Sequence, residues 1–167
     1  MKKIIILLAS QGQNPKLAES FKSEINNMGV EASILDLISL DLSLYSTREQ
    51  KNKGIPDCIP SIVKTLEDTS GFIFVSPEYN GGVPPVLSNF IAWVSVSQKN
   101  WRDSFNDKPA ILASFSASCG HHMLTSLRIQ LAHIGMTVLG REVTASFKKE
   151  LNMDSVTQVC SSLVRSI

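Results

Sequence analysis

Ser76-Pro77-Glu78-Tyr79-Asn80-Gly81-Gly82-Val83-Pro84-Pro85 joins a predicted strand to a predicted helix. The strand is the run 71–76, which is rich in β-branched and aromatic residues and too short for a helix. The two prolines suit a first helical turn, and apolar residues then recur at helical spacing as far as Val94. A polar, glycine-rich loop therefore follows a buried strand, at the position where open α/β sheets bind ligands.

The residue types of this loop fit two interpretations. Asn80-Gly81-Gly82 allows positive φ and a close approach of the backbone to a ligand, while Glu78 and Tyr79 add a carboxylate and a flat ring. The alternative is an ordinary tight turn whose polar residues face water, because turns are commonly polar and rich in glycine. The loop alone leaves both interpretations open.

Composition favours one soluble α/β domain over residues 1–167. The chain has 167 residues, of which 43% are hydrophobic, so it can bury a sizeable core. Sixteen basic and fifteen acidic residues leave a net charge of +1 without a basic block, so nucleic-acid binding has little support. Cys58, Cys119 and Cys160 are widely spaced and indicate neither a disulfide framework nor a zinc site. We therefore expect a cytoplasmic protein.

Neither of two apolar stretches predicts a targeting or membrane segment. Residues 1–9 begin like a short signal peptide, but no convincing small-residue cleavage site follows, so we predict a first strand. Residues 79–98 carry no charge, yet glycines and prolines interrupt the first third, and the remaining helix is too short to span a bilayer. We expect no membrane association.

Strands and helices alternate along the chain. The predicted strands are 3–9, 31–37, 71–76, 108–116 and 135–140, and the predicted helices are 15–28, 56–68, 85–98, 123–134 and 152–164. The charged segment 38–53 is either a mobile lid or a solvated connection, and we favour the connection. With no Walker lysine motif and no acidic pair after the first strand, this pattern predicts an α/β flavodoxin-like three-layer sandwich, with a five-stranded parallel sheet in the order 2-1-3-4-5.

A second polar loop follows the first strand. Ser10-Gln11-Gly12-Gln13-Asn14 precedes Pro15, and we expect Asn14 to cap the helix that Pro15 opens. Unpaired N–H groups and the positive end of the helix dipole make such a loop an anion site. Ordinary capping is the alternative, but the nearby Glu78 loop favours a phosphate site.

The run 76–93 resembles the signature of the NADPH-dependent FMN reductase family, flavodoxin-like flavoproteins that include azoreductases, quinone reductases and chromate reductases. The family typically shows Pro-Glu-Tyr-Asn, then Gly, a helix start that contains Pro, and a closing Ile-Asp-Trp, where this chain has Ala92 in place of Asp. The first loop also resembles the family's phosphate loop at Ser10, Asn14, Leu17 and Ala18, but it is shorter and has no Arg.

The resemblance implies FMN as cofactor and NADPH or NADH as electron donor. It places the FMN phosphate at Ser10, Gln11, Gln13 and Asn14, the ring and ribityl chain at Pro77, Glu78, Tyr79, Asn80 and Gly81, and the border of the ring at Ser116 and Gly120. The missing Arg removes a bidentate phosphate partner, which would weaken binding by about one or two powers of ten without abolishing it. No catalytic acid or base and no metal is implied.

The resemblance further implies a homodimer or dimer of dimers, with each flavin near the subunit boundary. The helix 85–98 is compatible with this, because Phe90, Trp93, Val94 and Val96 cover more of its circumference than one sheet can bury. The alternative is that neighbouring elements of the same chain cover them.

The function implied is an oxidoreductase that passes electrons to a small acceptor such as flavin, quinone, azo compound or metal oxyanion. One rival is a flavodoxin-type electron carrier, although carriers tend to be acidic and this chain is nearly neutral. Another is a binding module that has lost FMN. The pair His121-His122 does not predict a metal site, because neighbouring residues on a helix point about 100° apart and no third ligand sits at the right spacing.

Overall fold

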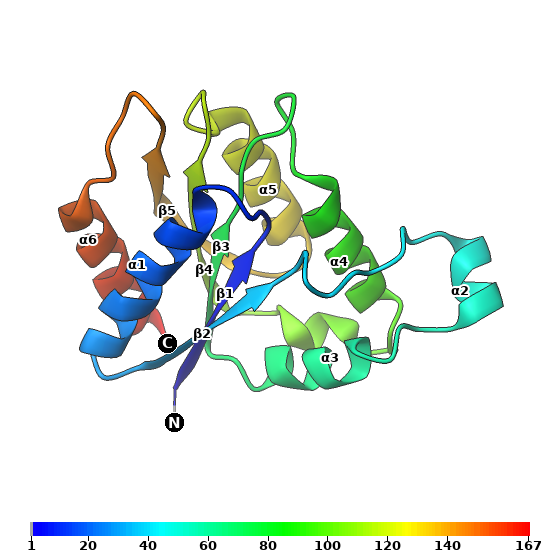
Figure 1. Ribbon diagram of the computed structural model, residues 1–167. Coiled ribbons are helices and arrows are strands. Elements are labelled where there is room, and N and C mark those ends of the chain that lie inside the picture. Colours follow the sequence, from blue (N-terminus) through cyan, green and yellow to red (C-terminus); the bar gives the residue numbers. More distant parts are fainter. Residues whose placement is uncertain (1) are drawn as a thin grey trace.

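Five parallel strands form one sheet in the order β2-β1-β3-β4-β5, which confirms the predicted topology. The structure is a computed structural model that describes residues 2–167 (Figure 1). The strands are β1 (Lys3–Leu8), β2 (Glu31–Asp36), β3 (Gly71–Val75), β4 (Pro109–Phe115) and β5 (Thr137–Ala145). Because all of them run the same way, the loops that follow the strands gather at one edge of the sheet (Figure 1).

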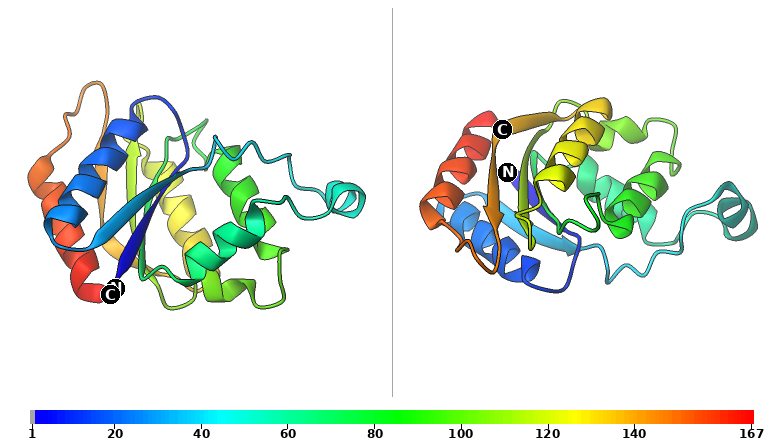
Figure 2. Two further views of the ribbon diagram at one scale, coloured as in Figure 1. Left: turned by 60° about the horizontal axis from the view of Figure 1, so that its bottom comes forward. Right: turned by 90° about the horizontal axis from the view of Figure 1, so that it is seen from above.

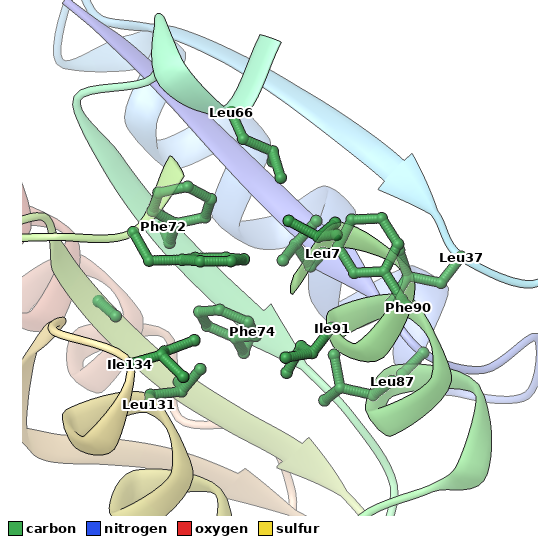
Figure 3. Packing of buried hydrophobic residues seen from close by; sticks show 14 of the residues in the cluster. Leu7, Leu37, Leu66, Phe72, Phe74, Leu87, Phe90, Ile91, Leu131 and Ile134 are labelled. Carbon is green, nitrogen blue, oxygen red and sulfur yellow. The ribbon is translucent and has the colours of Figure 1, made fainter. Parts of the chain in front are cut away.

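Helices cover both faces of the sheet, as expected for a three-layer sandwich. α1 (Asn14–Asn27) and α6 (Met153–Ser166) pack on one face, and α3 (Ile59–Glu67), α4 (Pro85–Ser95) and α5 (His121–His133) cover the other (Figure 1). A short 3-10 helix, η1 (Trp101–Ser104), precedes β4. Alternate residues of each central strand enter opposite cores, which is why these strands read as continuous apolar runs. Figure 3 shows the core beneath α3, α4 and α5, where Phe72 and Phe74 stack with ring centroids 6.0 Å apart.

The fifth strand is longer than the sequence predicted. Its pairing with β4 shifts between Ala110–Val138 and Leu112–Glu142, so a bulge lies within the strand. Arg128 of α5 holds this bulge, because its guanidinium donates to the Leu139 carbonyl at 2.8 Å and pairs with the Glu142 carboxylate at 2.8 Å. The predicted end at residue 140 was wrong, since the polar residues of the bulge conceal the second half of the strand.

The apolar residues of α4 are covered by the chain itself. Phe90, Trp93 and Val94 are fully buried, and the connection after β2 lies against this helix. Trp93 donates from Nε1 to the Ser43 carbonyl at 2.7 Å and packs edge-on against Tyr45. Phe90, Trp93 and Val94 therefore need no partner subunit to cover them, whereas Val96 is half-buried, and the homodimer stays a prediction.

The connection after β2 contains a helix that the sequence did not predict. α2 (Thr47–Lys53) buries none of its residues and stands clear of the other elements in both views (Figures 1 and 2). It begins at Ser46, whose Oγ accepts the Glu49 N–H at 3.0 Å. Its exposed, charged surface agrees with the solvated connection that we favoured. None of the helices within residues 2–167 is long and apolar enough to cross a membrane.

The side chain of Asn89 in α4 holds the part of this connection that precedes α2. We expect removal of this side chain to destabilise the fold. The side-chain oxygen of Asn89 accepts the Tyr45 N–H at 2.7 Å, and its amide donates to the Ser43 carbonyl at 3.0 Å. Asn89→Ala should lower the free energy of unfolding by about 1–3 kcal/mol, because partly buried backbone groups lose their partners. Urea denaturation would measure the loss against Asn52→Ala on exposed α2, and equal stability of the two variants would contradict the anchor.

Candidate functional site

A cleft of about 590 Å³ lies at the edge of the sheet where the strands end. Each strand contributes to it through the residues at or just after its carboxyl end. The volume is in the range of ordinary small-molecule sites. The lining residues are Ser10, Gln11, Gly12, Gln13, Asn14, Ile38, Pro77, Glu78, Tyr79, Phe115, Ser116, Ala117 and Phe147.

The cleft brings together eight of the eleven site residues predicted from the sequence. The eight are Ser10, Gln11, Gln13, Asn14, Pro77, Glu78, Tyr79 and Ser116. Asn80, Gly81 and Gly120 do not line it. Which of these residues touch a cofactor stays a prediction, but their side chains already have defined roles within the protein.

The side chain of Asn14 ties the first loop to the end of β4. Its Nδ2 donates to Ser10 Oγ at 3.0 Å and to the Phe115 carbonyl at 3.1 Å, and its Oδ1 accepts the Phe115 N–H at 2.8 Å. The predicted helix cap was therefore wrong: Gln13 occupies the capping position, without a side-chain hydrogen bond to the helix. Both amide hydrogens of Asn14 are used, so this side chain positions the loop rather than offering a donor to a ligand.

The first loop nevertheless keeps donors for an anion. Ser10 Oγ accepts from Asn14, which leaves its own hydroxyl hydrogen free to donate. Within residues 2–167, the backbone N–H groups of Gln11, Gly12 and Gln13 have no hydrogen-bond partner. These groups lie at the amino end of α1, where the helix dipole favours negative charge. Lys16 lines a separate groove and adds no charge to the cleft.

Asn80 and Gly81 form the tip of a two-residue hairpin. Tyr79 and Gly82 exchange backbone hydrogen bonds of 3.2 and 3.0 Å. The φ angles of Asn80 and Gly81 are 51° and 77°, as a type I′ turn requires. The turn places both residues beyond the cleft lining, and their contact with a ligand stays a prediction. Tyr79 remains at the cleft.

The carboxylate of Glu78 caps α5. Its Oε1 accepts the Ser118 hydroxyl at 2.7 Å, and its Oε2 accepts the N–H groups of His122 and Met123 at 3.0 and 3.1 Å. The Glu78 side chain is only 9% exposed. The hydrogen bond from Ser118 and those from the α5 backbone lower the pKa of Glu78 below its ordinary value. Its charge is therefore committed to joining the loops after β3 and β4.

The hydroxyls of Ser114 and Ser116 connect the loop after β3 to the end of β4. The Glu78 N–H donates to Ser116 Oγ at 2.7 Å, and Ser116 Oγ lies 2.9 Å from Ser114 Oγ. Gly120 covers the pair with a φ of 77°, and a Cβ there would lie 2.3 Å from Ser114 Oγ. Gly120 is thus needed for close packing beneath the loop. It lies outside the cleft lining, and its contact with the ring stays a prediction.

Phe147 lines the cleft but was not predicted from the sequence. It follows β5, its side chain is 81% exposed, and its ring packs edge-on against Phe115 with centroids 5.1 Å apart. The missed second half of β5 hid its position, because a strand ending at residue 140 leaves Phe147 in an undefined connection. The alternating buried residues Val143 and Ala145 beyond residue 140 are the signal that would have extended the strand and placed Phe147 at its end.

The sequence of the chain matches one protein family over most of its length. Residues 2–150 match the model of the NADPH-dependent FMN reductase family. The chain belongs to this family. An uncharacterized protein of Mycoplasma pneumoniae is 30% identical over 106 residues, which are 62% of this chain and 60% of that protein. A quinone reductase of Escherichia coli is 34% identical over 55 residues, 33% of this chain and 29% of the reductase. The chain thus spans less than two thirds of these two relatives.

A longer match and several solved structures extend the comparison. An NAD(P)H-dependent FMN reductase of Schizosaccharomyces pombe is 25% identical over 147 residues, 81% of this chain and 68% of that protein. FerB, a flavoenzyme NAD(P)H:(acceptor) oxidoreductase of Paracoccus denitrificans, superposes with a TM-score of 0.76 at 17% identity, over 99% of this chain and 96% of FerB. A flavodoxin from the domain Archaea gives 0.62 at 14% identity, over 98% of this chain and 93% of the flavodoxin. These structural likenesses show a flavodoxin-like fold.

The cap by Glu78 should make stability depend on pH. Glu78→Gln replaces one acceptor oxygen with a donor that faces another donor, so we expect a loss of about 1–2 kcal/mol near pH 7. Because the folded pKa is lowered, the carboxylate stabilises the fold fully above the unfolded value of about 4.3 and loses this effect as the pH falls through the folded pKa. Urea denaturation between pH 3 and pH 7 should show the two proteins converging in acid. Glu150→Gln, at an exposed position, is the control, and a difference independent of pH would contradict the cap.

Proposed function

We propose that this protein is an FMN-dependent oxidoreductase that takes electrons from NADPH or NADH and passes them to a small acceptor. Free flavins, quinones, azo compounds and metal oxyanions are the acceptors that fit this class. The observation that carries the proposal is one cleft that joins an anion-binding loop to an aromatic loop, in a chain whose family is established. Relatives described as a quinone reductase and an NAD(P)H-dependent FMN reductase support it.

The residues of the cleft fit FMN. The Ser10 hydroxyl and the free N–H groups of residues 11–13 would hold the phosphate, with the side-chain amides of Gln11 and Gln13 as further donors. Pro77 and Tyr79 offer a flat surface for the ring system. When bound, FMN supplies the hydride and electron chemistry.

The protein contributes positioning rather than acid or base catalysis. Glu78 and Tyr79 are the titratable side chains among the lining residues, and the Glu78 carboxylate is occupied by the α5 cap. We therefore assign no catalytic residue. The chain binds and orients the rings at the rigid edge of a buried sheet, where proximity and orientation account for the rate.

We also propose an oligomeric state and a cellular compartment for this protein. Family membership supports a homodimer or dimer of dimers in the cytoplasm, built from one domain per chain. The buried face of α4 gives no support to that interface. A second apolar region is available, because a groove of about 320 Å³ beside exposed Leu44 lies between the connection after β2 and the start of α4.

The lining of the cleft also favours a second candidate, a flavodoxin-like binding module with weak FMN affinity. Among residues 2–167, no Lys or Arg lines the cleft, so a phosphate dianion meets only neutral donors there. The visible spectrum of the purified protein distinguishes the candidates, because a protein that retains no flavin lacks the visible absorption of the flavin ring.

The first test is retention of flavin. Purified protein incubated separately with FMN and FAD, then desalted, should keep FMN, because one loop offers one phosphate site and no dinucleotide fingerprint accompanies it. The FMN complex should then oxidise NADPH or NADH in the presence of a quinone. Retention of FAD alone would overturn the choice of cofactor, and a complex that holds FMN but oxidises neither nucleotide would favour an electron carrier.

The second test compares how the loop after β1 and the loop after β3 contribute to FMN binding. Ser10→Ala and Tyr79→Ala should each weaken FMN by about 1–2 kcal/mol, through a lost hydrogen bond and lost packing respectively. Asn80→Gly keeps the positive φ of the turn and removes only the side-chain amide, so a loss of FMN affinity in this variant would report the predicted Asn80 contact. Calorimetric titration would measure all three, and loss of affinity in Asn80→Gly alone would move the site to the hairpin tip.

A further inference from the structure

Phe147 is the most exposed of the large hydrophobic side chains of residues 2–167. It is 81% exposed, compared with 77% for Leu44 and 67% for Ile129. A single exposed apolar side chain is common on protein surfaces, but one that borders a cleft is available to a ligand there. Because Phe147 lines the cleft, a ligand of the cleft can cover it.

The turn that carries Phe147 is well held. Ser146 and Lys149 exchange backbone hydrogen bonds of 2.9 and 3.2 Å, and buried Ser146 Oγ also accepts the N–H groups of Lys148 and Lys149 at 3.1 and 3.0 Å. The Phe147 ring rests edge-on against Phe115 at an interplanar angle of 84°. The exposed ring therefore has a fixed support on the last residue of β4.

The position of Phe147 complements that of Tyr79. Five large hydrophobic side chains are exposed among residues 2–167, and the two that are aromatic, Tyr79 at 51% and Phe147 at 81%, both line this cleft. They follow β3 and β5, with the end of β4 between them. Two exposed rings at one cleft suit a ligand that is itself flat and aromatic.

The absence of basic residues from the lining strengthens this assignment. Affinity for a flavin phosphate would ordinarily draw on an Arg or Lys, yet the lining offers neutral donors alone. More of the binding free energy must then come from contact with the ring system. Phe147 is an aromatic side chain at the cleft that no other group covers.

We propose that Phe147 is a flavin-binding residue whose ring packs against the isoalloxazine of FMN from the loop after β5. This assignment rests on the proposed function and adds a contact outside the loops after β1, β3 and β4. Its role is to bind and orient the ring system. No proton or electron passes through its side chain.

Riboflavin separates ring contacts from phosphate contacts, because it shares the ring system of FMN and lacks the phosphate. Phe147→Ala should weaken FMN and riboflavin by the same factor, about tenfold. Phe147→Tyr should stay close to the unchanged protein, and Phe147→Leu should fall between them. Ser10→Ala, in contrast, should weaken FMN and leave riboflavin unchanged. Quenching of flavin fluorescence by the full-length protein gives both affinities.

Ile129→Ala is the matched control, since Ile129 is also an exposed apolar side chain, lies on α5 and does not line the cleft. It should leave both affinities unchanged. Thermal melting without flavin should be the same for Phe147→Ala and the unchanged protein, because the Phe147 ring buries little surface in the chain. A folded variant that loses affinity then reports a ligand contact.

The remaining outcomes overturn the assignment. If Phe147→Ala weakens FMN but not riboflavin, the residue acts at the phosphate, and if it changes neither affinity but dissociates an oligomer in light scattering, a second subunit covers the ring. In both cases the proposed reductase function is unaffected, and the proposed contact between Phe147 and the ring is wrong. If the unchanged protein binds no flavin, both the ring contact and the proposed function are wrong.

Discussion

The central strands are buried on both faces, and this constraint decides where function can lie. Every residue of β3 is buried, and β1 and β4 are nearly so. A polar side chain along such a strand loses its water and needs a partner inside the protein, as Ser114 of β4 has in Ser116. Groups that bind ligands therefore lie beyond the ends of the strands. Because the strands are parallel, all of these ends lie at one edge of the sheet. The cleft is a consequence of the way the core is built.

At that edge, polar side chains are used first to hold the loops to one another. Asn14 joins the loop after β1 to the end of β4, and Glu78 joins the loop after β3 to the start of α5. The Glu78 N–H also reaches Ser116. These bonds fix the positions of three loops relative to the sheet. What remains for a ligand is a set of backbone N–H groups and exposed rings, which are rigid because the other groups are satisfied.

The sequence predicted the sheet and the loops well because both follow from local patterns. Apolar runs mark the strands, and Gly, Pro and polar clusters mark their ends. The roles of individual side chains depend on partners far along the chain, and these were the failures. Asn14 bonds to Phe115, 101 residues away, and Trp93 bonds to Ser43, 50 residues away. Nothing near Asn14 in the sequence distinguishes this bridge from a helix cap, and nothing near Trp93 shows that the chain itself covers α4.

The absence of Lys and Arg from the cleft lining, among residues 2–167, bears on how a phosphate could be held without an Arg. Burying a dianion away from cations is unfavourable, because lost hydration must be replaced. Gln11 and Gly12 are exposed, so an anion at their N–H groups would keep part of its water shell while the α1 dipole acts on it. The loop therefore suits a phosphate at the surface with the attached group directed along the edge of the sheet. In such an arrangement the phosphate fixes the position of the ligand, and the ring contacts supply the greater part of its affinity.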